Sequence, residues 1–172
     1  MEYSEYEMFQ QERFADPSPY PEIRVSAPNT FYAQLLLDDY AGMVSEFTAV
    51  NQYMFHHFVT KGSNDDAARL LEKIAFTEMR HLEMLAGLIL LLGQTPVYRN
   101  SRYLWNPRMV FYGSDFRGRL QADLESENKA VQKYQEHIDR IDDPHVKSVL
   151  DRIILDEKVH IVLFQEAMDK YC

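Results

Sequence analysis

The chain has 172 residues, of which 46% are hydrophobic and 13% aromatic, so it can bury the core of one globular domain without cross-links. Its 27 acidic and 18 basic side chains give a net charge of −9, which argues against nucleic acid or an anionic membrane as the main partner, since both attract basic surfaces. The single cysteine excludes an internal disulfide framework and a cysteine-rich metal site. We therefore expect a soluble, cytoplasmic protein with no transmembrane helix.

Residues 1–28 carry four prolines among glutamate and tyrosine residues, a composition typical of an extended or mobile segment. The segment lacks the basic and apolar regions of a secretory signal. We predict that residues 1–28 form a tail and residues 29–172 the folded domain. The tail could cover the surface of this domain, cover a partner subunit, or be disordered.

Four helical segments follow the tail, and each is bounded by capping residues or glycine. Asn29 and the run from Asn64 are typical helix starts, while Asp143-Pro144 is an N-cap followed by a first-turn proline. The predicted helices cover residues 29–60, 64–93, 114–142 and 144–172.

The connections between these helices predict the topology. No segment shows the period-two alternation of a strand, so the class is all-α. Two connections are short and join antiparallel neighbours, whereas the segment 94–113, about 20 residues long, is irregular and rich in turn-forming residues. Fully extended, it could reach roughly 60 Å, enough to run the length of a bundle. We predict an antiparallel four-helix bundle with one long crossover between the second and third helices.

The second and fourth helices repeat one polar pattern on an apolar seam. In each, apolar residues recur at spacings of three and four, and Glu-x-x-His interrupts them, at Glu78 and His81 and again at Glu157 and His160. Residues three apart lie on the same helix face, so each pair should point into the core.

The first and third helices each place one glutamate on the seam. Glu46 is followed by Tyr53, and Glu127 by Tyr134, at the same spacing. Glu125 lies roughly 200° around the helix from Glu127, so it should face away from the core. The chain is thus interpreted as two related helix pairs, offset by about 80 residues.

Four glutamates and two histidines on inward faces need compensation, because burying a single carboxylate costs several kcal/mol. Two divalent cations would balance four carboxylates, and an oxygen-rich set with one imidazole per metal suits iron or manganese better than zinc. The alternative is that these charges face solvent in another helical register. The predicted metal ligands are Glu46, Glu78, His81, Glu127, Glu157 and His160.

The remaining histidines are expected to be structural or superficial. His56 and His57 lie near the end of the first helix and are expected to be structural, while His137 and His145 are expected at the surface.

Three further side chains could support the ligands. Tyr53 and Tyr134 could donate hydrogen bonds, act as radical sites or simply pack in the core. Asp156 lies four residues before His160 and could accept its second ring N–H. Thr77 holds the equivalent place before His81, so the support there is expected to be weaker or absent.

At these residues the chain resembles the ferritin-like superfamily, near bacterioferritin, rubrerythrin and manganese catalase. The resemblance covers roughly residues 29–172 and implies a ferritin-like bundle in which the six residues bind two metal ions, Glu78 and Glu157 as bridges and Glu46 and Glu127 as terminal ligands. The matching segments are SEFTAVNQY (45–53), TEMRHLEML (77–85), DLESENKA (123–130) and LDEKVH (155–160).

The resemblance implies a di-iron oxidoreductase of ferroxidase or peroxidase type that reacts with dioxygen or hydrogen peroxide, with the six ligands as its catalytic residues. One alternative is peroxide disproportionation by two manganese ions, as in manganese catalases, which needs no external reductant. Others are non-catalytic iron binding or storage, and a structural bundle with a vestigial site.

Departures from the family refine these expectations. The 12 residues after His160 leave no room for the fifth helix of cage-forming members, so we expect a homodimer instead of a 24-subunit cage. One cysteine cannot build a rubredoxin domain, and the electron donor is not identified. Met79 matches the position of the haem-binding methionine of bacterioferritin, but methionine is also a common core residue, so haem is not expected.

Overall fold

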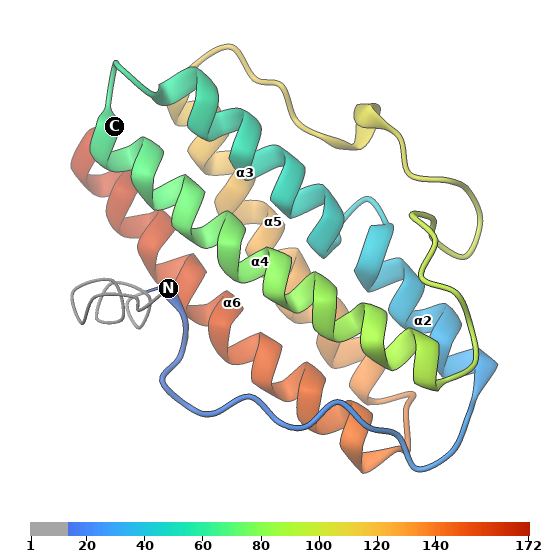
Figure 1. Ribbon diagram of the computed structural model, residues 1–172. Helices are drawn as coiled ribbons and strands as arrows, with labels where there is room; N and C mark the ends of the chain where they lie inside the picture. Colours follow the sequence, from blue (N-terminus) through green and yellow to red (C-terminus); the bar gives the residue numbers. More distant parts are fainter. Residues whose placement is uncertain (1–13) are drawn as a thin grey trace, which may run out of the picture.

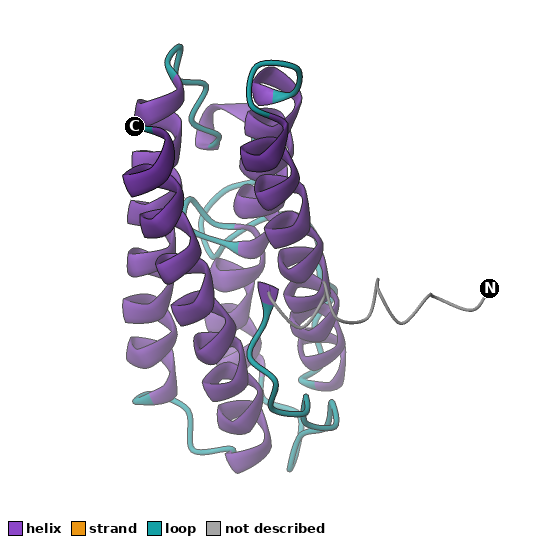
Figure 2. Cartoon of the chain, turned by 90° about the vertical axis from the view of Figure 1, so that its left-hand side faces the viewer, coloured by secondary structure: helices purple, strands orange, loops and turns teal. Residues whose placement is uncertain are grey.

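The computed structural model describes residues 14–172, which form a bundle of long helices (Figure 1). Figure 2 shows helices and loops but no strand in this part of the chain. The helices are α2 (Thr30–Ala41), α3 (Glu46–Thr60), α4 (Asp65–Leu91), α5 (Phe116–Ile138) and α6 (Pro144–Tyr171), with a short 3-10 helix at Pro107–Met109.

The helices pack in two pairs that share one core. α3 packs mainly on α4, and α5 mainly on α6. Two apolar clusters fill the interior, one built on 84–92 at the end of α4 and 146–154 of α6, the other on 71–75 of α4 and 163–167 of α6. The stretch between the clusters carries the Glu-x-x-His motifs, so the polar residues lie midway along the bundle. The predicted all-α four-helix fold with one crossover is confirmed.

The predicted helix starts are confirmed by their caps. The side chains of Asn29, Asn64 and Asp143 each accept hydrogen bonds from backbone N–H groups of the turn that follows. Gly62 and Gly93 follow α3 and α4 with φ angles of 85° and 93°, a conformation that favours glycine.

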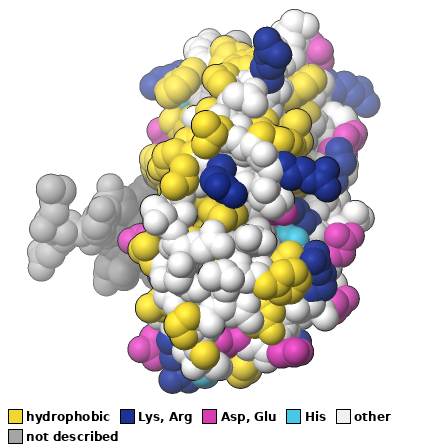
Figure 3. All heavy atoms as spheres, turned by 90° about the vertical axis from the view of Figure 1, so that its right-hand side faces the viewer, with side chains coloured by type: hydrophobic (Ala, Val, Ile, Leu, Met, Phe, Trp, Pro, Cys, Tyr) yellow, Lys and Arg dark blue, Asp and Glu magenta, His cyan; other side chains and the backbone are white. Residues whose placement is uncertain are grey.

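The crossover joins α4 to α5 along the outside of the bundle (Figure 1). The indole of Trp105 donates a hydrogen bond to Thr48 Oγ1, and the ring of Tyr98 stacks on that of Phe47 with centroids 4.0 Å apart. These contacts fix the crossover against the outer side of α3. The face in Figure 3 carries hydrophobic side chains scattered among lysine and arginine side chains, and exposed apolar residues of the crossover include Val97, Tyr98, Tyr103, Leu104, Phe111 and Tyr112.

The prediction of one continuous helix over 29–60 is wrong, because residues 42–45 separate α2 from α3. Gly42 leaves the helical conformation, and its carbonyl oxygen accepts hydrogen bonds from the hydroxyls of Ser45 and Thr48. Lys133 of α5 donates to the carbonyl oxygens of Asp38 and Val44 on either side of the break. Ser45 then caps α3 and places Glu46 in its first turn.

Residues 14–28, here called the strap, carry no long helix and lie along α4 and α6 (Figure 1). Arg152 of α6 donates to the carbonyl oxygens of Asp16 and Ser18, and Ser26 N–H donates to Asp143. Residues 1–13 of the predicted tail lie outside the described residues.

Candidate metal centre

The six predicted ligands come together in the middle of the bundle, one from α3, one from α5 and two each from α4 and α6. Their exposed fractions are 3% or less. The side chains form two overlapping groups, in each of which the potential ligand atoms lie within 4.8 Å of one another: Glu46, Glu78, His81 and Glu157; and Glu78, Glu127, Glu157 and His160. The two groups share Glu78 and Glu157, as expected of bridging carboxylates.

In the first group, the ring of His81 turns Nδ1 toward the carboxylates. This atom lies 2.9 Å from Glu78 Oε2, 3.4 Å from Glu157 Oε1 and 3.5 Å from Glu46 Oε2. One nitrogen and three oxygens thus face a common point.

The second group repeats this geometry around His160. Its Nδ1 lies 2.8 Å from Glu78 Oε1, 2.9 Å from Glu157 Oε2 and 3.7 Å from Glu127 Oε1. Each shared glutamate therefore offers one oxygen to each group, which is the arrangement that two neighbouring metal ions require.

One buried oxygen supports the fit of cations to this cage. Glu78 Oε1 has no hydrogen bond of acceptable geometry, although it lies close to His160 Nδ1. A buried carboxylate oxygen without a hydrogen bond is costly, and a cation would compensate it. The donor set of carboxylate oxygens and imidazole nitrogens suits iron or manganese.

The pKa shifts of the buried glutamates and histidines also indicate that the cluster favours added positive charge. Burial raises the pKa of Glu46 and of Glu127 well above the ordinary range, and the charges of the two shared glutamates raise it further. Burial alone would lower the pKa of His81 and His160, but the surrounding carboxylates raise it well above the usual value. Burial likewise raises the pKa of Glu78, but both histidines outweigh it and hold this pKa below its ordinary range. These shifts all favour added positive charge within the cluster, which metal ions would supply.

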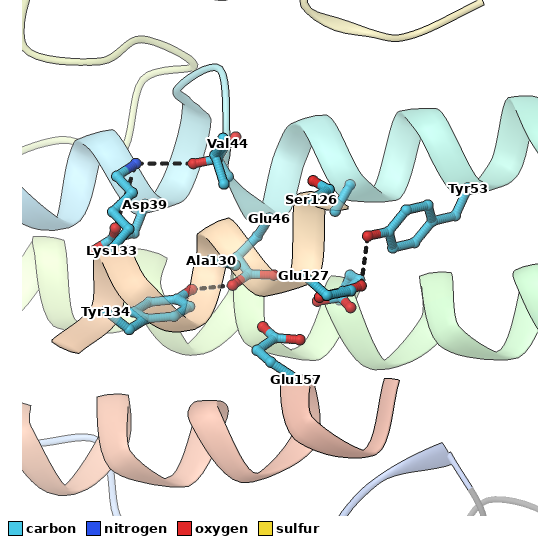
Figure 4. A pocket seen from close by; sticks show the side chains of 13 residues that line it. Asp39, Val44, Glu46, Tyr53, Ser126, Glu127, Ala130, Lys133, Tyr134 and Glu157 are labelled. Atoms are coloured by element: carbon cyan, nitrogen blue, oxygen red, sulfur yellow. Dashed lines mark hydrogen bonds and ion pairs between the residues drawn. The ribbon is translucent and has the colours of Figure 1, made fainter. Parts of the chain in front are cut away.

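Two tyrosines fix the terminal glutamates across the bundle (Figure 4). Tyr53 of α3 donates its hydroxyl hydrogen to Glu127 of α5 at 2.5 Å, and Tyr134 of α5 donates to Glu46 of α3. Burial raises the pKa of both phenols well above the usual value, and the neighbouring glutamate adds to this. Of the roles left open for these tyrosines, two are seen: each donates a hydrogen bond to a glutamate, and each also packs in an apolar cluster.

A small cavity reaches the cluster between α3 and α5 (Figure 4). Its volume of about 10 Å³ is close to that needed by one water molecule. Small side chains line the approach, among them Ala49, Ser126 and Ala130.

The prediction that Asp156 accepts a hydrogen bond from His160 is wrong, because Asp156 contacts His81 instead. Asp156 Oδ2 lies 2.9 Å from Nε2 of His81, whereas Nε2 of His160 lies 3.0 Å from the backbone oxygen of Phe14 in the strap. Thr77 also donates to this oxygen, at 3.2 Å. Helices α4 and α6 are antiparallel, so the residue one turn before a histidine faces the opposite helix's histidine.

The prediction that His137 lies at the surface is also wrong. His137 is only 5% exposed, and its Nδ1 lies 2.7 Å from Asp39 Oδ2. His56 forms the corresponding pair at the other end of the cluster, with Nδ1 2.8 Å from Asp123 Oδ2. Asp39 and Asp123 were not singled out in the sequence; the signal for Asp123 is its place one helical turn before Glu127.

The other singled-out residues lie away from the cluster. Glu125 is exposed and pairs with Lys129, which confirms that it faces outward. Met79 is 42% exposed on α4. His57 is buried against the carbonyl oxygen of Ala68, and His145 is partly exposed.

Comparisons with known proteins agree with the fold and the cage. Residues 41–171 match the ferritin-like domain family. The chain is 27% identical to a probable manganese catalase from Clostridium acetobutylicum, over 87% of this chain and 75% of that protein, and 30% identical to a bacterioferritin from Streptomyces coelicolor, over 74% and 75%. The crystal structure of a manganese catalase from Anabaena superposes with a TM-score of 0.82 at 26% identity, covering 90% of this chain and 78% of that one.

Among residues 14–172, no helix combines the length and apolar character needed to cross a membrane. The family match, the bundle with its single crossover and the buried carboxylate and histidine cluster lead to one assignment. The chain belongs to the ferritin-like family, as a protein of the dimetal carboxylate type.

Proposed function

We propose that this chain disproportionates hydrogen peroxide at a pair of manganese ions. The observation that carries the proposal is the closed cage of six buried side chains, in which two shared glutamates join two ligand groups of matching geometry. The similarity to manganese catalases, which extends over most of the chain, supports this reaction over the others that such a cage can host.

The metal pair would supply the redox chemistry, taking two electrons from one hydrogen peroxide and returning them to another. Two molecules of H2O2 then give one O2 and two H2O, and the two protons released by the first are consumed by the second. No external reductant is required. The residues have the tasks of holding the ions, moving protons and limiting access.

Glu46 and Glu127 are suited to the proton transfers. Each lines the cavity, where an entering peroxide would meet it, and a carboxylate within reach of the substrate can accept a proton and return it. Tyr134 and Tyr53 keep these two carboxyl groups in place.

The cavity would select small substrates. Its volume of about 10 Å³ admits a molecule near the size of water and excludes organic peroxides. We expect oxygen release with hydrogen peroxide and none with tert-butyl hydroperoxide.

The test is to load metal-free protein with Mn²⁺ or with Fe²⁺, count the bound ions, and follow oxygen with an electrode. The proposal expects two Mn²⁺ per chain and one O2 released for every two H2O2 consumed. Glu127→Gln should lower the rate about 100-fold or more, while Glu125→Gln, an exposed neighbour on the same helix, should leave it unchanged. An inert manganese-loaded protein would overturn the proposal.

A di-iron reaction is the second candidate, and the 30% identity to a bacterioferritin favours it. In that case the Fe²⁺-loaded protein would consume dioxygen or reduce peroxide as a ferroxidase or peroxidase. Uptake of many iron ions per chain would instead indicate storage. The homodimer stays a prediction, and size-exclusion chromatography separates it from a large cage.

A further inference from the structure

The two histidines of the cluster differ in what holds their second ring nitrogen. Nε2 of His81 meets a carboxylate oxygen of Asp156 at 2.9 Å, and Nε2 of His160 meets the neutral backbone oxygen of Phe14 at 3.0 Å. Both histidines are fully buried, so no water replaces these partners. A carboxylate makes the imidazole a stronger metal ligand than a neutral carbonyl does.

Asp156 is held firmly in its position facing His81. Besides the histidine, it accepts hydrogen bonds from Asp16 N at 2.7 Å, from the Tyr20 hydroxyl at 2.5 Å and from Arg152 Nη1 at 2.6 Å. Asp156 itself is fully buried, and the guanidinium of Arg152 keeps its charge compensated. The four donors leave the carboxylate a single orientation.

The strap supplies the oxygen that His160 uses. Phe14 packs its side chain into an apolar cluster, and Thr77 donates a second hydrogen bond to its backbone oxygen. The ring of Tyr20 lies between two guanidinium groups, with Arg80 at 3.8 Å and Arg152 at 4.0 Å from its centroid. The support of His160 therefore depends on a segment that lies outside the four-helix core.

The ligands themselves are arranged alike at the two positions. Each position has one glutamate held by a tyrosine of the opposite helix pair, and both share the same two glutamates. The partners of the two histidines thus place a charged group behind one metal position and a neutral group behind the other.

From this asymmetry we propose that the two metal positions are unequal: the position of His81 binds its ion more tightly and fills first, and Asp156 is the positioning residue that makes it so. The inference rests on the proposed dimetal function and adds an order of loading to it. The position of His160 fills second and depends on the docked strap.

The test titrates metal-free, full-length protein with Mn²⁺ and follows the free ion by electron paramagnetic resonance. Two steps are expected, separated by about 10- to 100-fold in affinity. Asp156→Asn, which keeps the shape and removes the charge, should weaken the first step until the two merge. The matched control is Thr77→Val, which removes the hydroxyl that donates to the Phe14 carbonyl oxygen, the partner of His160. This variant should leave the first binding step unchanged.

A second measurement does not depend on the folding of any variant. In wild-type protein labelled with ¹⁵N-histidine, Zn²⁺ added stepwise should shift the ring resonances of His81 in the first equivalent and those of His160 in the second. Simultaneous shifts, or His160 first, would overturn the proposed order while two bound ions still support the dimetal function. Absence of any bound metal would overturn both.

Discussion

The two halves of the bundle, α3 with α4 and α5 with α6, provide the same chemistry on different local structure. Each contributes one unshared glutamate, a Glu-x-x-His turn and a tyrosine that reaches the other half. The scaffolds differ: α3 begins at a break where α5 is continuous, and the support of the two histidines comes from a carboxylate in one case and the strap in the other. A shared metal pair would require the same ligands from both halves, whereas the residues behind the ligands differ between them.

The largest effect is expected from the shared glutamates, where the two halves should be indistinguishable. Glu78→Gln and Glu157→Gln each remove charge from both ligand groups, so each should weaken metal binding by more than about 100-fold. Glutamine keeps the size of glutamate, and three carboxylates remain to compensate the two histidines, so the metal-free proteins should remain folded. Metal analysis after dialysis, with circular dichroism, checks both points. One variant that retains two ions while the other loses them would show that the halves are not equivalent.

A smaller and again matched effect is expected from the tyrosines. Tyr53→Phe and Tyr134→Phe each remove the hydroxyl that binds a buried glutamate, which should cost about 1–3 kcal/mol of unfolding free energy in the metal-free protein. Urea unfolding of both variants measures this. Costs that differ by more than the error would indicate that one tyrosine only packs in the core.

The loss of a serine hydroxyl should have different effects on stability in the two halves, because α3 begins at a break and α5 does not. Ser45 caps α3 by accepting from Thr48 N–H, whereas Ser126, its counterpart, lies within α5. Ser45→Ala should therefore cost about 1 kcal/mol, and Ser126→Ala less than about 0.5 kcal/mol. Urea unfolding is again the measurement, and equal costs would contradict the assignment of the cap.

The sequence predicted the elements that leave a periodic or capping signal. The heptad pattern predicted that the Glu-x-x-His turns face the core, and capping residues such as Asn64 predicted the helix starts. The break at 42–45 was not predicted, because the apolar pattern continues through it. Gly42 and Ser45 are therefore compatible, by sequence pattern alone, with one continuous helix.

The residues behind the ligands were harder to predict for a different reason. The acceptor for His160 is a backbone oxygen, which has no residue-type signature at all. His137 lies beside the third-helix seam, and its partner is Asp39 of α2, which is 98 residues away in the sequence. Such pairings depend on how distant helices pack, which spacing within one helix does not reveal.

The smallest effect concerns the starts of α4 and α6, which are capped by Asn64 and Asp143 at equivalent positions. Burial raises the pKa of Asp143, but hydrogen bonds from Ser26, His145 and Val146 outweigh it and leave the pKa below 3.8. A carboxyl group with a lowered pKa stabilises the fold fully above its unfolded value and loses this contribution as the pH falls below it. The amide of Asn64 does not titrate.

Replacing Asp143 by Asn should therefore make the two helix starts alike. We expect Asp143→Asn to lose less than about 1 kcal/mol at pH 7, because asparagine also caps well, and the difference from wild type should shrink between pH 4 and pH 2. The reverse change, Asn64→Asp, should give α4 the same acid sensitivity. Urea unfolding of the three proteins across this range checks the prediction. A difference between wild type and Asp143→Asn that does not change with pH would mean that the Asp143 carboxylate contributes to stability through its shape alone, as Asn64 does.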